Sequence, residues 1–281
     1  MNDLIIGCST NYDWSKLKYW INSINKSGFK GEKVMLLMNC DKDTVQKIHD
    51  AGFNIIGFRQ DNDGNLIYQS SIPVHVERFL HIHNFLKDKD YRYVITTDVK
   101  DVVFQQNPIT WLETHMGYKQ INVASESIRY EDEDWGSNNL MKSFGPLIHS
   151  HNRDRLIYNA GTISGKFDTM LPLFLNIYML CNGTSHYIEG GGGPDQAALN
   201  VLLNMKPYRD ITRFTASEEG WAAQLGTTGP QVAHKYGDKL IEKCPILVDD
   251  MVCTSEGKPF ALVHQYDRVP EWKQIIENKY K

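Results

Sequence analysis

Apolar and polar positions follow two different periods along the first third of the chain. Short runs of apolar, largely β-branched residues predict buried strands, and between them apolar residues recur at helical spacing. The predicted strands cover residues 4–9, 33–39, 54–59 and 92–97, and the predicted helices cover about 14–27, 41–51 and 75–88. Strands and helices that alternate in this way are typical of a doubly wound parallel sheet, so the pattern predicts an α/β fold.

Local signals support these helix boundaries. Asp13 and Asp41 stand where helix N-caps are expected, and Gly28 and Gly52 follow the first two predicted helices, as glycine often does at a helix C-terminus. Beyond Pro108 the alternation becomes less regular. There the predicted strands cover 121–125, 161–164, 211–216 and 260–264, and the predicted helices lie near 167–181 and 195–204.

Composition narrows the class of protein. A chain of 281 residues with 41% hydrophobic content can bury a substantial core, and we expect a single domain over residues 1–281 because no flexible linker interrupts it. The formal charge of −4 is spread along the chain without a basic stripe, so a nucleic-acid partner is not expected. The five cysteines are odd in number and contain no CxxC pair, which indicates reduced thiols rather than a disulfide framework or a zinc site.

The apolar segments are short throughout. The first one, Leu4 to Ile6, lacks the length and flanking residues of a signal peptide, and no later segment has the length of a membrane helix. We therefore expect a cytoplasmic protein without a membrane span.

Two carboxylates, Asp98 and Asp101, follow the fourth predicted strand. Ligands of open α/β sheets bind at the carboxyl ends of the strands, and paired hard oxygen ligands suit Mg²⁺ or Mn²⁺ and, through the metal, a diphosphate. The two side chains converge only if the chain turns directly after Thr97. The structural alternative is that Asp98 caps this turn while Asp101 is solvated or pairs with Lys100.

Two further segments place polar groups beside glycines. Asn159 precedes Ala160 and Gly161 at the start of a short strand, where the backbone can approach a ligand closely. Asp195 and Gln196 open a helix after Pro194 and four glycines, but this is not a phosphate-binding P-loop because no Lys-Ser/Thr pair follows the glycines. An ordinary turn and a carboxylate favoured by the helix dipole are the structural alternatives.

His264 and Arg268 follow the last predicted strand. A histidine at this position can complete a carboxylate metal site, and an arginine can pair with a diphosphate. The structural alternative for His264 is a hydrogen-bonded histidine without a ligand.

In this order, the strand-end acids, the Asn159-Ala-Gly161 segment, the Asp195-Gln196-Ala-Ala-Leu-Asn200 segment and His264 resemble the motifs of GT-A nucleotide-sugar glycosyltransferases, especially the retaining glycogenin-like group. The resemblance covers most of the chain. It implies a Rossmann-like, mostly parallel central sheet flanked by helices, with a smaller acceptor-side subregion. The nucleotide-binding half would be about 1–108, and the donor-sugar and acceptor half about 109–281. One departure is the extra residue between the acids, since the family pattern is Asp-x-Asp.

The resemblance also implies roles for individual residues. It implies Mn²⁺ or Mg²⁺ held by Asp98, Asp101 and His264, with Asp101 as the direct ligand and Asp98 on the ribose or the metal. The implied donor-sugar and catalytic residues are Asn159, Asp195 and Gln196. The implied nucleotide contacts are Ser9, Thr10, Asn11, Tyr12, His75, Arg78 and Asp98, and the diphosphate contacts are Arg268 and Lys258.

The acceptor is expected to bind near the acidic and aromatic segment 130–138. Sugars present apolar faces that stack on tryptophan, so Trp135 and Trp221 are candidate platforms, with Glu189 as a polar contact. The structural alternative for both tryptophans is packing in the core.

We therefore predict a metal-dependent glycosyltransferase that moves a sugar from a nucleotide-sugar, with a UDP-linked donor favoured, to a hydroxyl of a glycan or another acceptor with retention. Inversion would instead make Asp195 or Glu189 the first candidate base. A sugar-phosphate nucleotidyltransferase normally has a Gly-rich basic loop after the first strand, which the segment 8–12 lacks. A haloacid-dehalogenase-like phosphatase would place its aspartates after the first strand. A non-catalytic nucleotide-sugar or glycan-binding module remains an alternative.

Overall fold

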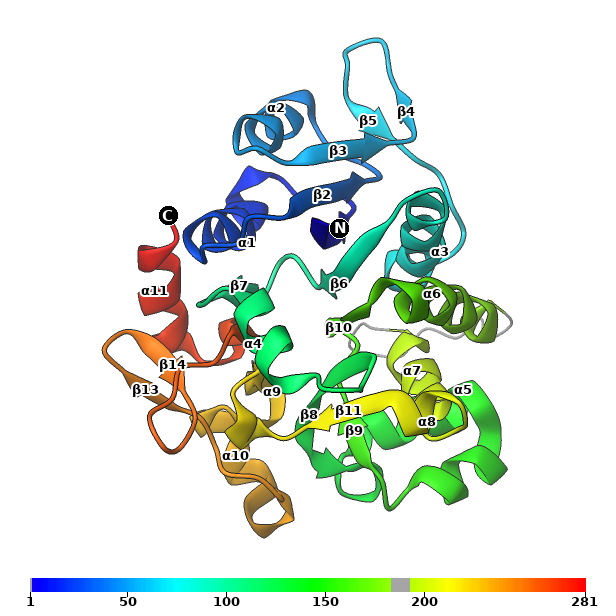
Figure 1. Cartoon of the computed structure of the whole chain (residues 1–281), viewed down its shortest axis with the longest axis vertical. Coiled ribbons are helices and arrows are strands. Elements are labelled where there is room, and N and C mark those ends of the chain that lie inside the picture. The colour runs from blue at the N-terminus through cyan, green and yellow to red at the C-terminus, as the bar shows by residue number, and fades with distance from the viewer. Residues whose placement is uncertain (1, 183–192) are drawn as a thin grey trace.

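A mixed central sheet organises the molecule (Figure 1). The computed structural model describes residues 2–182 and 193–281, and everything below refers to them. The strands of this sheet are β1 (Asn2–Ser9), β2 (Glu32–Leu37), β3 (Asn54–Gly57), β6 (Tyr91–Thr97), β8 (Ile121–Arg129), β9 (Leu156–Tyr158), β10 (Thr162–Lys166) and β11 (Thr212–Thr215). Their order is β11-β8-β10-β6-β1-β2-β3, with β9 paired to β8.

Most neighbouring strands of the sheet run parallel. The pairs β1–β2, β1–β6, β2–β3 and β8–β11 are parallel, whereas β10 is antiparallel to both β6 and β8. Because β6 and β8 are both antiparallel to the same strand, they point in the same direction and end at the same edge of the sheet. The predicted α/β fold with a mostly parallel sheet is confirmed.

Helices cover both faces of the sheet (Figure 1). The helices are α1 (Trp14–Lys26), α2 (Lys42–Asp50), α3 (Val74–Leu86), α4 (Pro108–His115), α5 (Asp134–Asn152), α6 (Phe167–Cys181), α7 (Asp195–Leu203), α8 (Tyr208–Ile211), α9 (Leu225–Thr228), α10 (Pro230–Tyr236) and α11 (Pro270–Lys279). On one face α3 and α6 pack together over a core that includes Leu4, and on the other α1 packs Trp20 into a core that includes Ile5. Neighbouring residues of β1 thus point to opposite faces, and both faces are apolar and buried, as in a doubly wound sheet.

The first helices begin and end close to the predicted residues. The side chain of Asp13 accepts a hydrogen bond from the backbone N–H of Lys16, and that of Asp41 accepts one from Thr44 N–H, so both are N-caps. Gly28 lies just after α1 with a φ of +85°, a conformation that favours glycine. The local sequence signals therefore predicted these helix ends correctly.

A second, three-stranded sheet adjoins the first. It consists of β12 (Ala222–Gln224), β15 (Leu262–His264) and β7 (Val102–Phe104), with β15 in the middle. β15 runs antiparallel to β7 and parallel to β12. Two small hairpins complete the strands: β4 (Arg59–Gln60) with β5 (Leu66–Ile67), and β13 (Ile246–Val248) with β14 (Met251–Cys253).

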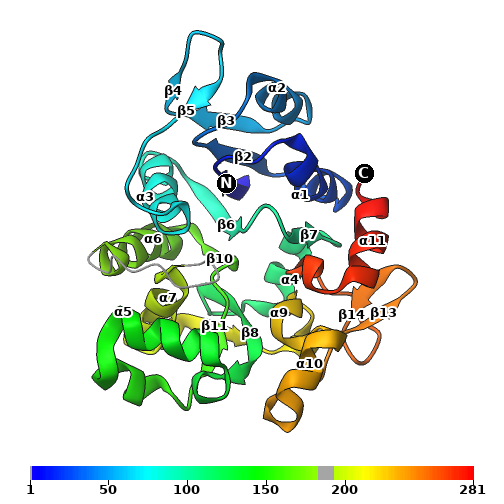
Figure 2. The same cartoon turned by 180° about the vertical axis from the view of Figure 1, so that it is seen from behind.

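Several helices were not expected from the sequence. The largest is α5, which lies beside α7 (Figure 2) and bends at Gly145, where φ is +76°. Glycine and proline at 136, 145 and 146 interrupt its apolar period, which is why the pattern did not predict it. The shorter helices α4, α10 and α11 each begin with proline, which is well suited to the first helical position.

None of the helices within residues 2–182 and 193–281 combines the length and the apolar character needed to cross a membrane.

Candidate active site

The first half of the candidate site forms where β6 meets β10. In this antiparallel pair Thr97 lies opposite Thr162, and β6 ends there. The backbone N–H of Asp98 then donates a hydrogen bond of 3.0 Å to the carbonyl of Gly161. The chain then bends at residues 99–101 before β7 begins at Val102, so it turns soon after Thr97, as convergence of the two acids requires.

The second half forms in the smaller sheet. There His264 lies opposite Val102, the residue after Asp101, and the backbone N–H of Gln265 donates to the carbonyl of Asp101 at 2.8 Å. These contacts hold Asp101 and His264 side by side although they are far apart in the sequence. The register of β15 on β7 therefore decides which histidine meets the acids.

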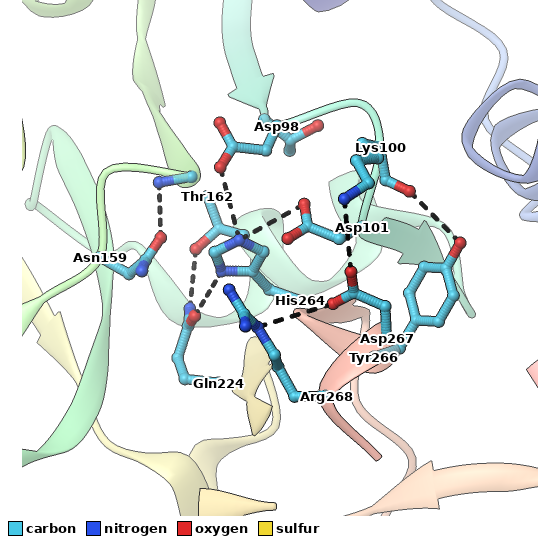
Figure 3. Close-up of polar contacts among 12 residues, drawn as sticks. Asp98, Lys100, Asp101, Asn159, Thr162, Gln224, His264, Tyr266, Asp267 and Arg268 are labelled. Atoms are coloured by element: carbon cyan, nitrogen blue, oxygen red, sulfur yellow. Dashed lines mark hydrogen bonds and ion pairs between the residues drawn. The ribbon is translucent and has the colours of Figure 1, made fainter. Parts of the chain in front are cut away.

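Asp98, Asp101 and His264 form one cluster (Figure 3). His264 Nε2 lies 3.5 Å from Asp98 Oδ2 and 3.8 Å from Asp101 Oδ1, and one ligand atom from each residue falls within 4.8 Å of the others. Lys100, considered above as a partner for Asp101, has its Nζ 3.6 Å from Asp267. The three residues could thus hold a metal ion.

The hydrogen bonds of His264 test whether a metal fits. Its Nδ1 lies 2.7 Å from Gln224 Oε1, and the Gln224 amide is oriented by donating to Thr162 Oγ1 at 3.0 Å. His264 Nδ1 is therefore the donor, and in the neutral ring Nε2 carries the lone pair; this nitrogen is buried without a hydrogen-bond partner among the described residues. The lone pair of Nε2 and the two carboxylates are then all hydrogen-bond acceptors with no donor between them. A divalent cation bound between them would coordinate all three groups.

Burial and neighbouring charges shift all three pKa values in the cluster. Burial tends to lower the pKa of His264, but the carboxylates of Asp101 and Asp98 raise it above its usual value. Burial raises the pKa of Asp101, and although it acts the same way on Asp98, the charges of Arg78 and His264 keep the pKa of Asp98 well below its usual range. The cluster therefore favours bound positive charge, supplied by a proton or by a metal ion.

Arg78 holds two of the acids, Asp98 and Asp195, in place. It is buried in α3 and donates to Asp98, to Asp195 Oδ2 at 3.2 Å and to the carbonyl of Ala160 at 3.3 Å. Burial disfavours the charged form of this arginine, but Asp98 and Asp195 raise its pKa further above its usual value. Arg78 thus ties the predicted metal residues to the predicted sugar residues and keeps its charge.

The predicted donor-sugar residues lie together. Asn159 Nδ2 donates to Glu126 Oε1 at 2.6 Å, and Asn159 Oδ1 accepts from Gly161 N–H at 2.5 Å. Gln196 Oε1 accepts from Ala160 N–H at 3.3 Å, beside Asp195 at the start of α7. Both amides are therefore held in hydrogen bonds rather than free in the cavity.

Gly161 allows these groups to come so close. A Cβ atom there would lie 2.7 Å from His264 Cε1 and 2.8 Å from Asp98 Oδ2. Any side chain at this position would push Asp98 and His264 apart, so their close approach requires glycine here.

Most of these groups border one cavity of about 750 Å³, a size typical of ligand pockets. Its lining includes Ser9 at the end of β1, Thr10 and Tyr12 just after it, and Trp135 in α5. Ser9 is 2% exposed, and its hydroxyl is buried without a hydrogen-bond partner among the described residues. Of the predicted residues, the cavity is also lined by His75, Arg78, Asp98, Asp101, Asn159, Asp195, Gln196, His264 and Arg268.

Other predicted residues lie elsewhere. Trp221 is fully buried and packs on Trp111 with ring centres 5.0 Å apart, so it is a core residue and not an acceptor platform. Lys258 is exposed and donates to the carbonyl of Glu219 at 3.4 Å, away from the cavity, whereas Lys100 lines it. Asn11 is not among the lining residues. Glu189 lies outside the described residues.

Glu126 is the main residue that the sequence analysis missed. It lies near the end of β8, where the pairing with β9 is irregular between Ser125 and Arg129 and Ser127 has a φ of +62°. The sequence did contain a signal, because a carboxylate follows an apolar strand here just as Asp98 follows β6. Glu133, within the predicted acceptor segment 130–138, also lines the cavity, and lining residues that were not predicted include Gly226, Thr227, Val232, Lys235, Tyr236 and Gln265.

Comparison with known proteins shows a likeness in fold. The chain is similar to the galactosyltransferase LgtC in a complex with donor and acceptor sugar analogues, with a TM-score of 0.54 and 12% identity, over 98% of this chain and 95% of the LgtC chain. A structure of an active-site mutant of LgtC gives a TM-score of 0.56 with the same identity and coverage. No protein-family model and no curated protein matches the chain. The structural match confirms the GT-A fold.

Proposed function

We propose that this chain is a metal-dependent glycosyltransferase that moves a sugar from a nucleotide-sugar to a hydroxyl of a glycan or another acceptor, with retention. A UDP-linked sugar is the first donor to test. The observation that carries the proposal is the cluster of Asp98, Asp101 and His264 inside a cavity of about 750 Å³. The GT-A fold shared with a galactosyltransferase crystallised with donor and acceptor analogues supports the same class of reaction.

Asp101, His264 and Asp98 would hold the metal, Mn²⁺ or Mg²⁺. When bound, such an ion supplies positive charge that offsets the charge of a departing diphosphate without any proton transfer. Asp101 and His264 are free to face it directly, whereas Asp98 also accepts from Arg78. Because Asp98 Oδ1 accepts from Arg78, Oδ2 is the oxygen that would contact the metal or the ribose.

Two cations at the cavity would add to the binding of the diphosphate. Lys100 Nζ and Arg268 Nε lie 3.6 and 3.9 Å from the carboxylate of Asp267, which holds both near the cavity that they line. Their remaining N–H groups can donate to phosphate oxygens. Lys100 thus takes the place that the sequence analysis gave to Lys258.

Asp195, Gln196 and Asn159 would bind the transferred sugar. Asp195 uses Oδ2 for Arg78, which leaves Oδ1 as an acceptor for a sugar hydroxyl. The oxygens of the two amides can face the positive charge that develops on the sugar, as in glycoside hydrolysis. In this assignment the chain's residues orient and stabilise the sugar, and retention requires no strong base opposite the leaving group.

Calorimetry with nucleoside diphosphates, each with and without Mn²⁺, tests the binding part of this proposal. We expect Mn²⁺ to tighten UDP binding at least about tenfold in the unmodified protein and not in Asp101→Asn. Asp43→Asn is the matched control, because Asp43 is an exposed carboxylate on α2 whose one ion pair among the described residues is with Lys47. It should bind like the unmodified protein.

Turnover of a panel of nucleotide-sugars with Mn²⁺, followed by NMR, tests the reaction and the anomeric configuration of the product. Transfer or hydrolysis that Asp101→Asn abolishes supports the enzyme. Metal-dependent binding without turnover of any donor would favour a binding module. Absence of both would refute the proposal.

A further inference from the structure

Glu126 is a buried carboxylate to which the proposal above gives no role. It is 7% exposed and lines the cavity between the metal cluster and α7. Its own carbonyl accepts a hydrogen bond from Thr227 Oγ1 at 2.7 Å, which fixes the backbone where β8 becomes irregular. A carboxylate is rarely buried without a partner, so its hydrogen bonds indicate what it does.

Both partners of this carboxylate are amides of the proposed sugar site. Asn159 Nδ2 donates to Glu126 Oε1 at 2.6 Å, and the side chain of Gln196 also hydrogen-bonds Glu126. At their other ends both amides accept backbone N–H groups, Asn159 Oδ1 from Gly161 and Gln196 Oε1 from Ala160. Each amide is thus held between one carboxylate and one backbone donor.

This arrangement determines whether the oxygen or the NH₂ group of each amide faces Glu126. A side-chain amide has nearly the same shape after a half-turn, but its donor and acceptor exchange places. Burial raises the pKa of Glu126, but its hydrogen bonds with Asn159 and Gln196 favour the ionised form. In that form the carboxylate only accepts, so the NH₂ group of each amide must face it, and the amide oxygens must face the backbone N–H groups. Neither amide can turn over without losing hydrogen bonds at both ends.

We infer that Glu126 is a positioning residue that holds the amides of Asn159 and Gln196 in one orientation toward the transferred sugar. Each amide then has one N–H group and a lone pair of its oxygen left for the sugar, in a fixed order. Such preorganised dipoles stabilise developing charge without reorganising during the reaction. This inference rests on the proposed function for its catalytic consequence.

Glu126→Gln is the test variant, because it keeps the size of the side chain but can donate as well as accept. The amides then lose their single enforced orientation. We expect kcat to fall about 10- to 100-fold, less than on loss of a direct oxyanion donor, with a donor KM changed by less than about threefold. The affinity for Mn²⁺ should stay the same, because Glu126 is not in the metal cluster.

Glu242→Gln is the matched control. Glu242 is also a partly buried carboxylate beside β8, where it accepts from Ser127 Oγ at 2.7 Å and from Ser217 N–H at 2.8 Å, but it does not line the cavity. It should keep its kcat within about twofold. An equal loss of kcat in both variants would overturn the inference, since it would indicate a general effect of losing a buried charge.

The orientation itself is measured by NMR of ¹⁵N-labelled asparagine and glutamine side chains. The signals of the two amides are assigned from their loss in Asn159→Asp and Gln196→Glu. In Glu126→Gln we expect both signals to shift while the backbone spectrum remains that of the folded protein. This NMR measurement does not depend on turnover. It therefore tests the positioning role of Glu126 even if no donor is consumed and the proposed function fails. Unshifted signals, or shifted signals with an unchanged kcat in an active enzyme, would overturn the inference.

Discussion

The regions before and after Asp98 are built by different means. In residues 2–97 the strands β1, β2 and β6 are packed on both faces by apolar side chains, and the polar backbone is satisfied by regular ladders and helix caps. From Asp98 onward, the side chains of the site are placed by irregular turns, the short sheet β12-β15-β7 and side-chain hydrogen bonds. The first region also contributes to the site: Arg78 donates to Asp98 and Asp195, and Ser9, Thr10, Tyr12 and His75 line the cavity.

The difference suggests that the first region mainly stabilises the fold and that the second mainly positions the side chains of the site. Apolar packing is favourable in proportion to the area removed from water and does not depend on the orientation of one atom. Hydrogen bonds and metal coordination depend on distance and angle, so small shifts in the second region have large effects on the site. We therefore expect substitutions in the first region to change the free energy of unfolding and those in the second to change ligand binding.

The largest effect on binding is expected from His264→Ala. It removes the nitrogen lone pair that faces Asp98 and Asp101. Affinity for Mn²⁺ should fall by about 100-fold or more, measured by calorimetry. The variant should lose less unfolding free energy than the core variant described next. Retained Mn²⁺ affinity would show that the metal binds elsewhere, and it would contradict the expectation that the second region determines ligand binding.

Leu36→Ala tests the first region. Leu36 is 1% exposed near the end of β2, and truncation of its side chain should lower the free energy of unfolding, measured by urea denaturation, by about 2–5 kcal/mol. Mn²⁺ and UDP affinities of the folded protein should not change. A change in these affinities as large as the one in His264→Ala would show that the two regions are not separable.

Gln224→Leu sharpens the comparison within the second region. Gln224 accepts the Nδ1–H of His264 and so fixes the ring without reaching the cavity. Its loss should weaken Mn²⁺ binding about 10- to 100-fold in calorimetry. Gln224→Glu keeps an acceptor for Nδ1 and should retain more of the affinity than the leucine variant. Equal affinities of the two variants would contradict a role in orienting His264.

The smallest effect is expected from Trp135→Ala. Trp135 is partly exposed and lines the cavity, so it can stack on an acceptor sugar. We expect the acceptor KM to rise about 3- to 10-fold in steady-state assays, with the donor KM unchanged. Trp221→Phe is the contrast: it should lower stability and leave both KM values as they are. An effect of Trp221→Phe on the acceptor KM would refute its assignment to the core.

Regular elements were the easiest to predict. The ends of α1 follow from Asp13 and Gly28, because caps act over a few residues. Helix α5 was not predictable from the apolar period, because glycine and proline interrupt that period. The helix is stabilised by packing against α7. The sequence analysis could not tell Trp135 from Trp221 either, since residue type does not report burial.

The sequence by itself determined the α/β pattern and the residue types that end the strands: Asp98 and Asp101 after β6, His264 in β15. These follow from the short-range periods of strands and helices. Only the tertiary structure decided that these three residues meet, that Lys100 and not Lys258 lines the cavity, and that Glu126 joins Asn159 and Gln196. The reason is that their contacts depend on the registers of β10 on β6 and of β15 on β7, which pair segments far apart in the chain and are selected by the packing of the whole molecule.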